Sequence, residues 1–214
     1  MNLLRNLCIT AFFGTVSLFI VQPAKASLIT FDDLASGQTS FGFDGDGDTI
    51  DDVIFTTTNP LGFNISGPGL NQVFINKPGL EGTSLLDPDL KVDFLKGAKD
   101  FLSFGFALDS FEGSNTFAAF NLFDSNGNSL ASTQELGVLG TSDFPEGKIQ
   151  LNFSGVAAYG TLNFSSNFGR YIIDNFEGNF GSTEVVTSVP ESATILGSGI
   201  ALVFGALFHK RKRK

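Results

Sequence analysis

The stretch that decides the fold is Leu102-Ser103-Phe104-Gly105-Phe106-Ala107-Leu108-Asp109, in which an apolar residue occupies every second position. An alternation of period two places the large apolar side chains on one face of a β-strand and the small or polar ones on the other. The same period recurs at 148–154 and 161–165, where Ile, Leu and Phe alternate with Lys, Gln, Asn, Thr and Ser. The sequence therefore predicts strands with one buried face and one face toward solvent.

Further strands are expected on both sides of this stretch. Their candidate segments are 28–31, 53–57, 72–76, 90–95, 116–123 and 170–176. Clusters of Gly, Pro, Asn and Asp separate them and favour turns. No stretch between residues 27 and 179 shows the sustained period of 3.6 that a surface helix would need. We expect about nine to eleven short strands in one all-β domain, folded as a two-sheet antiparallel β-sandwich similar to a jelly roll.

Phenylalanine dominates the composition, since the chain has 25 Phe, two Tyr and no Trp. A buried Phe ring contributes about 1.5 to 3 kcal/mol of apolar transfer free energy and needs no hydrogen bond. Most of these rings fall on the alternating apolar positions, which predicts that they fill the interior of the sandwich. The alternative is an aromatic platform on which sugar rings stack, and the Tyr candidates for it are Tyr159 and Tyr171.

The N-terminus has the features of a secretory signal peptide. Arg5 supplies a positive charge, residues 7–21 are mostly apolar, and Ala24 and Ala26 are small residues at the positions that signal peptidase reads. We expect cleavage after Ala26, which makes 1–26 a removable signal helix.

The C-terminus combines an apolar run at 193–208 with a basic tail at 209–214. At about 1.5 Å of rise per residue, the run gives roughly 24 Å of helix, slightly short of the ~30 Å hydrocarbon core of a membrane. We therefore expect a marginal transmembrane helix, with the cations held on the cytoplasmic side and the preceding chain outside.

Directly before this helix lies the motif Val189-Pro190-Glu191-Ser192. The order of motif, apolar helix and basic cluster resembles the PEP-CTERM sorting signal of exported bacterial proteins, with Ser192 in place of the second proline. The resemblance implies recognition by exosortase, a membrane-embedded transpeptidase, with cleavage near the motif and delivery to the cell surface or an extracellular polysaccharide matrix. An ordinary single-span tail anchor is the alternative. The expected organisation is a signal peptide at 1–26, an ectodomain at 27–179, a flexible spacer at 180–188 and the sorting signal at 189–214.

Removing both ends leaves a strongly acidic chain. Residues 27–188 carry six basic and 21 acidic side chains, a net charge of −15 against −9 for the whole chain. Nucleic acid is excluded as a natural partner because phosphate binding needs the opposite sign of charge. The one Cys, Cys8, and the one His, His209, lie in the two ends. The ectodomain therefore has no disulfide, no zinc site of Cys or His, and no nucleophile with a His base.

The sharpest chemical signal is the acidic loop at 44–52. Its candidate calcium ligands, at loop positions 1, 3, 5, 7 and 9, are Asp44, Asp46, Asp48, the main-chain carbonyl of Ile50, and Asp52. Such a set of oxygens is the kind that Ca²⁺ prefers. The loop is similar to the Asp-rich calcium loops of EF-hand-like and integrin-type FG-GAP repeats, although Thr49 and Phe55 depart from the EF-hand pattern at positions 6 and 12. The alternative is a solvated acidic hairpin loop whose Asp and Gly residues serve turn formation.

A second acidic constellation joins the two ends of the ectodomain. Asp32 and Asp33 follow its first expected strand, and Asp174 lies in its last. These strands are similar to the first and last strands of carbohydrate-binding jelly rolls, a resemblance that implies a structural calcium shared between them. The alternative is that these residues cap turns at strand ends.

Two functions from different classes remain. The first is a non-enzymatic, calcium-stabilised β-sandwich that is exported through the inner membrane, held transiently by its C-terminal helix, and retained at the cell surface or in the matrix, where it contacts polysaccharide. The alternative is a secreted glycan hydrolase or lyase, which would need a cleft with two carboxylates about 5 to 5.5 or 6.5 to 9.5 Å apart. We expect the first function, and hence a protein that is not an enzyme.

Overall fold

The computed structural model describes residues 26–67, 69–83, 90–110 and 115–181. These residues belong to one compact unit, Pro23–Thr183. The expected signal peptide apart from Ala26, the spacer beyond residue 181 and the sorting signal at 189–214 lie outside the described residues. Within the described ranges, no helix is long and apolar enough to cross a membrane.

Ten β-strands make up the described part of the chain, and the pairings between them are antiparallel. They are β1 (Ser27–Ile29), β2 (Ser40–Phe43), β3 (Val53–Thr56), β4 (Leu80–Thr83), β5 (Leu90–Leu108), β6 (Phe117–Phe123), β7 (Ser129–Leu136), β8 (Glu146–Asn152), β9 (Ala157–Ser165) and β10 (Arg170–Phe180). The described residues contain no helix. The predicted all-β class is confirmed, although the sequence pattern did not predict β2, β4 or β7.

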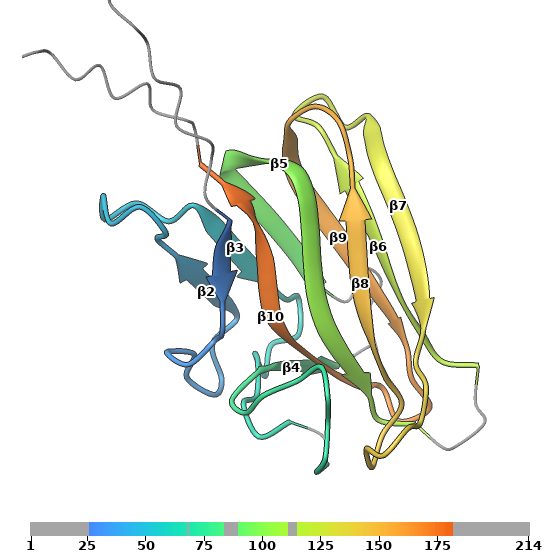
Figure 1. Cartoon of the computed structure of the whole chain (residues 1–214). Coiled ribbons are helices and arrows are strands. Elements are labelled where there is room, and N and C mark those ends of the chain that lie inside the picture. The colour runs from blue at the N-terminus through green and yellow to red at the C-terminus, as the bar shows by residue number, and fades with distance from the viewer. Residues whose placement is uncertain (1–25, 68, 84–89, 111–114, 182–214) are drawn as a thin grey trace, which may run out of the picture. The chain divides into compact units, whose positions relative to one another are not determined.

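Strand β5 takes part in both layers of the sandwich. Its first half pairs with β3 and β9, and the first sheet has the order β2-β3-β5-β9-β6-β7. Its second half pairs with β8 and β10, and the second sheet has the order β1-β10-β5-β8, with β4 beside the start of β10. Between the halves, Gly97 and Asp100 have φ values of 81° and 67°, and the bend of β5 can be followed in Figure 1. The sequence predicted two separate strands because the polar residues around this bend interrupt the apolar alternation.

Phenylalanine rings from both sheets meet in the core. The ring of Phe176 on β10 lies 5.1 Å from that of Phe55 on β3. The ring of Phe104, on the second half of β5, lies 5.6 Å from that of Phe120 on β6. All four side chains are fully buried. All ten strands belong to one hydrogen-bonded network that β5 links into two layers, and these contacts between the layers confirm the predicted Phe-filled interior.

The predicted strand at 72–76 is wrong, because these residues form an irregular segment. In a strand, the backbone N–H groups would donate hydrogen bonds to a neighbouring strand. In this segment, backbone N–H groups donate to carboxylates instead. Glu146 Oε2 accepts hydrogen bonds from the N–H groups of Val73 and Phe74 at 2.9 and 3.1 Å. The acceptor lies more than 70 residues away along the chain, so the local pattern could not reveal it.

This irregular segment packs on the outer face of the second sheet. Ile75 forms a small buried cluster with Ala107 of β5 and Ile172 of β10. A Cβ atom on Gly105 of β5 would stand 2.0 Å from the carbonyl oxygen of Phe74, so only glycine allows the segment to lie this close. The segment leads into β4, which contributes Glu81 and Gly82 to a cavity at the edge of this sheet.

Candidate functional site

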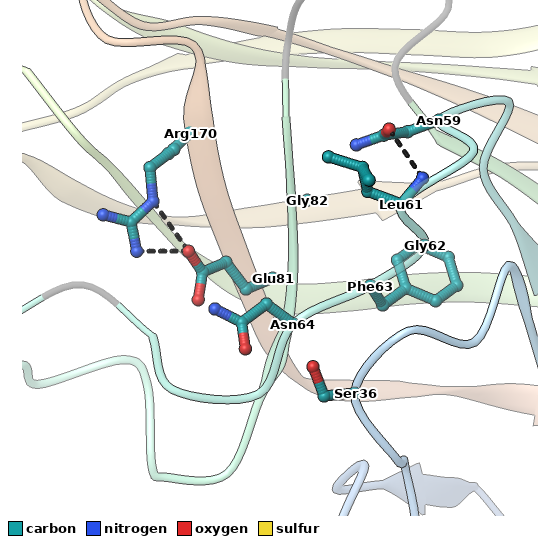
Figure 2. A pocket seen from close by; sticks show the side chains of 9 residues that line it. All are labelled: Ser36, Asn59, Leu61, Gly62, Phe63, Asn64, Glu81, Gly82 and Arg170. Carbon is teal, nitrogen blue, oxygen red and sulfur yellow. Dashed lines mark hydrogen bonds and ion pairs between the residues drawn. The ribbon is translucent and has the colours of Figure 1, made fainter.

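An open cavity of about 210 Å³ lies at the edge of the second sheet, where β4 pairs with the start of β10. The connection between β1 and β2, the connection between β3 and β4, and strands β4 and β10 all contribute to it. Its lining residues, which Figure 2 shows, are Ser36, Asn59, Leu61, Gly62, Phe63, Asn64, Glu81, Gly82 and Arg170.

An ion pair forms one wall of the cavity. Arg170 donates two hydrogen bonds to Glu81 Oε1, from Nε at 2.7 Å and from Nη2. The other carboxylate oxygen of Glu81 accepts the N–H of Gly67 at 2.9 Å. Glu81 is buried, whereas the side chain of Arg170 is 46% exposed. Arg170 also contacts Asp109 at 3.3 Å, and the two carboxylates, Glu81 above all, raise the pKa of the guanidinium. Both charges are therefore held in fixed positions.

The opposite wall is a tight loop. Asn59 accepts the N–H of Leu61 on its side-chain oxygen at 3.1 Å, and its main-chain oxygen accepts the N–H of Gly62 at 2.9 Å. Gly62 has a φ of 70°, and a Cβ atom there would stand 2.5 Å from the backbone of Gly37. Asn64 exchanges two backbone hydrogen bonds of 2.9 Å with Glu81, which ties this loop to the ion pair. The cavity is therefore built from backbone that cannot shift easily.

The cavity lining combines polar side chains with a larger apolar surface. A hydroxyl from Ser36, two side-chain amides, a guanidinium and a carboxylate line the same space, and Leu61, which is 81% exposed, adds an apolar surface. Its volume lies below the ~300 to 1,000 Å³ of pockets that bury drug-sized ligands.

Sequence reasoning did not identify this cavity. Its residues come from four distant segments, and none of them forms a recognisable motif. One compositional signal was available, because Arg170 is the single arginine between residues 27 and 188. Arginine is the residue that best holds a carboxylate by two hydrogen bonds.

Neither tyrosine offers an open ring face for stacking on sugars. Tyr171 is fully buried, with its ring 3.9 Å from that of Phe164. The ring of Tyr159 stacks against Phe123 at 4.9 Å, and the Nζ atom of Lys91 lies over it at 5.4 Å. The aromatic-platform alternative therefore has no support at these two positions.

The acidic loop brings three of its predicted ligands together. One carboxylate oxygen from each of Asp44, Asp46 and Asp48 lies within 4.8 Å of the others. Two oxygens bound to one Ca²⁺ ion at about 2.3 to 2.6 Å can lie up to about 5 Å apart, a range that includes these three oxygens. Asp52 is buried at the root of the loop, where its Oδ2 accepts the N–H of Gly45 at 2.8 Å. The side chain of Ile50 is exposed.

Hydrogen bonds within the loop hold Asp44 in its ionised form. Desolvation acts to raise the pKa of Asp44, but the N–H groups of Thr49 and Gly47, at 2.8 and 2.7 Å, outweigh it and lower the pKa. A carboxylate that stays ionised is the form that binds a cation.

A residue that the sequence did not predict contacts the same loop. The Nζ atom of Lys96, from β5, lies 2.8 Å from Asp46 Oδ2, 2.8 Å from Asp48 Oδ2 and 2.9 Å from Asp52 Oδ1. Hydrogen bonds to these carboxylates, that to Asp46 first, raise the pKa of the ammonium group. The acidic loop therefore carries an internal cation of its own.

The second acidic constellation is only partly assembled. Strands β1 and β10 pair, with Ile29 opposite Phe176. Asp174 is buried; its Oδ2 accepts the N–H of Asn76 at 2.8 Å, and its Oδ1 has no hydrogen-bond partner among the described residues. Burial raises the pKa of Asp174 to about 6, and the nearby negative charge of Asp32 adds to this shift. Asp32 and Asp33 are exposed.

We expect Asp174→Asn to stabilise the domain at neutral pH and to change its pH dependence. Because the pKa of Asp174 is about 6 when folded and about 3.9 when unfolded, the folded state binds more protons between these values. This group therefore adds stability as the pH falls from about 7 to 4. The variant should exceed the wild type by about 2 kcal/mol at pH 7.5, and the difference should shrink at pH 5. Urea unfolding at both pH values tests this, with Asp33→Asn as the exposed control. An equal difference at both pH values would contradict it.

Comparisons with known proteins give structural likenesses of low identity. No family model and no curated protein matches the chain. The K2 cleaved adhesin domain of Lys-gingipain is 11% identical, with 74% of this chain and 100% of that chain covered and a TM-score of 0.40. The K3 cleaved adhesin domain of Lys-gingipain from Porphyromonas gingivalis W83 is 14% identical, with coverages of 72% and 98% and a TM-score of 0.39. The C-terminal family 22 carbohydrate-binding module of Clostridium thermocellum Xyn10B is 10% identical, with coverages of 73% and 93% and a TM-score of 0.36.

Proposed function

We propose that this protein is an exported, non-enzymatic β-sandwich that binds polysaccharide at the cell surface or in an extracellular matrix. The observation that carries the proposal is the cavity beside the Arg170–Glu81 ion pair. A sugar ring carries hydroxyls that donate and accept hydrogen bonds and C–H faces that pack on apolar surface, and the cavity lining combines polar side chains with apolar surface.

Binding by this cavity is expected to be weak for one sugar and stronger for a polymer. A typical hydrogen bond contributes about 0.5 to 1.5 kcal/mol net, and a cavity of this size makes few of them. Many copies of the protein on one polysaccharide, or many equivalent sugars on one chain, raise the effective affinity through repeated contact. This behaviour suits retention in a matrix.

The chemistry of the cavity favours binding over hydrolysis. Hydrolysis of a glycoside by the usual route needs two carboxylates placed on either side of the bond. Among the described residues that line the cavity, Glu81 is the single carboxylate, and Arg170 holds it in an ion pair. Asp109 contacts the same guanidinium, so its charge is engaged as well. The glycan hydrolase or lyase remains the second candidate, and no observation on the described residues favours it.

The terminal segments supply the proposed route of export. Signal peptidase would cleave after Ala26, and exosortase would process the chain near Pro190, Glu191 and Ser192 after transient anchoring by 193–208. The support is the sequence pattern alone. Replacing Pro190 and Glu191 by alanine should leave an uncleaved, membrane-held form, and identical fractionation of variant and wild type would reject processing.

Calcium is proposed to stabilise the fold at the acidic loop. Asp44, Asp46, Asp48 and Asp52 would hold the ion together with the carbonyl of Ile50. The bound ion would remove the repulsion among carboxylates that lie close together. The cluster of Asp32, Asp33 and Asp174 is a second proposed calcium site, supported by the buried Oδ1 of Asp174, which accepts no hydrogen bond from the described part of the chain.

A glycan array probed with the purified protein tests the proposed function. We expect the wild type to bind a subset of neutral glycans and Ser36→Trp, which fills the cavity mouth, to lose about tenfold or more in affinity. Ser154→Trp is the matched control, because this exposed residue lies between β8 and β9, at the opposite end of β8 from the cavity. Binding that survives in Ser36→Trp, or an array without any bound glycan, would reject the proposal.

A further inference from the structure

Lys96 is placed beside the acidic loop by the backbone itself. The N–H of Leu95 donates a 2.8 Å hydrogen bond to the carbonyl of Asp52, and the N–H of Asp52 donates one of 2.7 Å to the carbonyl of Phe43. The last residue of the loop is thereby held beside β5, one position before Lys96. The side chain of Lys96 is 19% exposed, much less than that of Lys91 on the same strand, at 46%.

The carboxylate of Asp52 is directed into the loop. Its side chain is 2% exposed, and its Oδ1 is the oxygen that faces Lys96. This oxygen lies 2.9 Å from Nζ of Lys96. A buried carboxylate needs a cation close to it, because the cost of burying the charge is otherwise large. The loop therefore requires a positive charge at this point.

The ammonium group of Lys96 and a calcium ion would compete for the same carboxylates. Calcium needs six to eight oxygen ligands at about 2.3 to 2.6 Å. Three of the candidate oxygens, one each from Asp46, Asp48 and Asp52, already lie 2.8 to 2.9 Å from the Lys96 nitrogen. Both cations cannot fill this space together, since their charges repel each other strongly at such short range.

We propose that Lys96 is the built-in counter-ion of the acidic loop, and that calcium binds there only by displacing its ammonium group. This inference rests on the proposed binding of calcium and adds a residue that sets its strength. The loop keeps its fold without calcium because lysine neutralises part of its charge. Lysine also weakens calcium binding, because the ion must compete with a cation that is covalently attached.

Calcium titration of the full-length chain in mild detergent tests the inference. The variants are Lys96→Gln and, as a matched control, Lys91→Gln, which removes the same charge from a site where lysine pairs with Asp93 at 2.7 Å. We expect the Kd for calcium to fall about tenfold or more in Lys96→Gln and to stay near the wild-type value in Lys91→Gln. In EDTA, Lys96→Gln should melt at a lower temperature than Lys91→Gln, and calcium should restore it. Adding Asp46→Asn to Lys96→Gln should abolish the gain in calcium affinity. That result would assign the calcium binding to this loop.

The possible results separate the inference from the calcium proposal. Calcium binding of equal strength in wild type and Lys96→Gln would overturn the role of Lys96 and leave calcium binding intact. Binding by Lys96→Gln alone would support the inference in its strongest form. If neither protein binds calcium at millimolar concentration, the proposed calcium site in this loop is rejected. The proposed competition between calcium and Lys96 is then rejected as well.

Discussion

Replacing Phe176 by alanine should lower the free energy of unfolding by about 3 to 5 kcal/mol, the usual cost of removing a buried aromatic ring. Phe176 is fully buried, and its ring lies within 5.1 Å of Phe55 and 5.5 Å of Phe104. The substitution leaves a cavity between the two sheets, in a domain without disulfides. For a domain of this size, the melting temperature should fall by roughly 10 °C.

Phe168→Ala is the matched control for this experiment. Phe168 is 53% exposed and lies just before β10. We expect a change of about 0.5 kcal/mol or less for this variant, as for most surface substitutions. Thermal and urea unfolding of both variants would measure the difference. Similar losses in the two variants would contradict the interior described for the sandwich.

Arg170→Met should be the most damaging change at the cavity. It leaves the buried carboxylate of Glu81 with the N–H of Gly67 and the hydroxyl of Ser66 as its described partners. Breaking a buried ion pair by removing one partner costs about 3 to 5 kcal/mol. Because the Arg170 side chain is 46% exposed, water offsets part of this cost, and we expect a loss of about 2 kcal/mol.

A double-mutant cycle shows whether the charge of Glu81 causes this loss. Glu81→Gln removes the charge and keeps a side-chain oxygen for the N–H of Gly67. The double variant Arg170→Met/Glu81→Gln should therefore recover most of the stability that Arg170→Met loses. Urea unfolding of the wild type, both single variants and the double variant gives the coupling energy. Additive losses in the double variant would show that the two side chains act independently.

The sheet framework was accessible from the sequence because its signal is local. The alternating segments 102–108 and 149–153 were predicted separately, and the structure pairs them, with Phe104 opposite Ile149. Each exposes one apolar face, so burial against the other sheet follows from the alternation. β7 could not be predicted in the same way, because this edge strand has mostly exposed residues and polar side chains on both faces.

The cavity could not be predicted because long-range register creates it. Glu81 lies opposite Ile172, two residues beyond Arg170, only after β4 pairs with β10. The wall that faces this ion pair depends on a loop whose Gly62 packs against the backbone of Gly37. None of these contacts produces a periodic pattern in the sequence from which it could be predicted.

The acidic loop could be predicted in part. The spacing of its aspartates was visible in the sequence, and the structure brings Asp44, Asp46 and Asp48 together. Lys96 lies 44 positions after Asp52, so its approach depends on the pairing of β3 with β5. Sequence reasoning identified the negative charges and missed the positive charge that accompanies them.

Hydrogen exchange of the full-length chain, with and without a glycan selected on the array, tests the central claim most directly. If polysaccharide binds in the cavity shown in Figure 2, the backbone N–H groups of residues 61–64 and 81–82 should exchange more slowly when the glycan is present. The outer face of β6 and β9 around Tyr159 should exchange at an unchanged rate. If the glycan slows exchange at β6 and β9 and leaves exchange at the cavity unchanged, the account is contradicted.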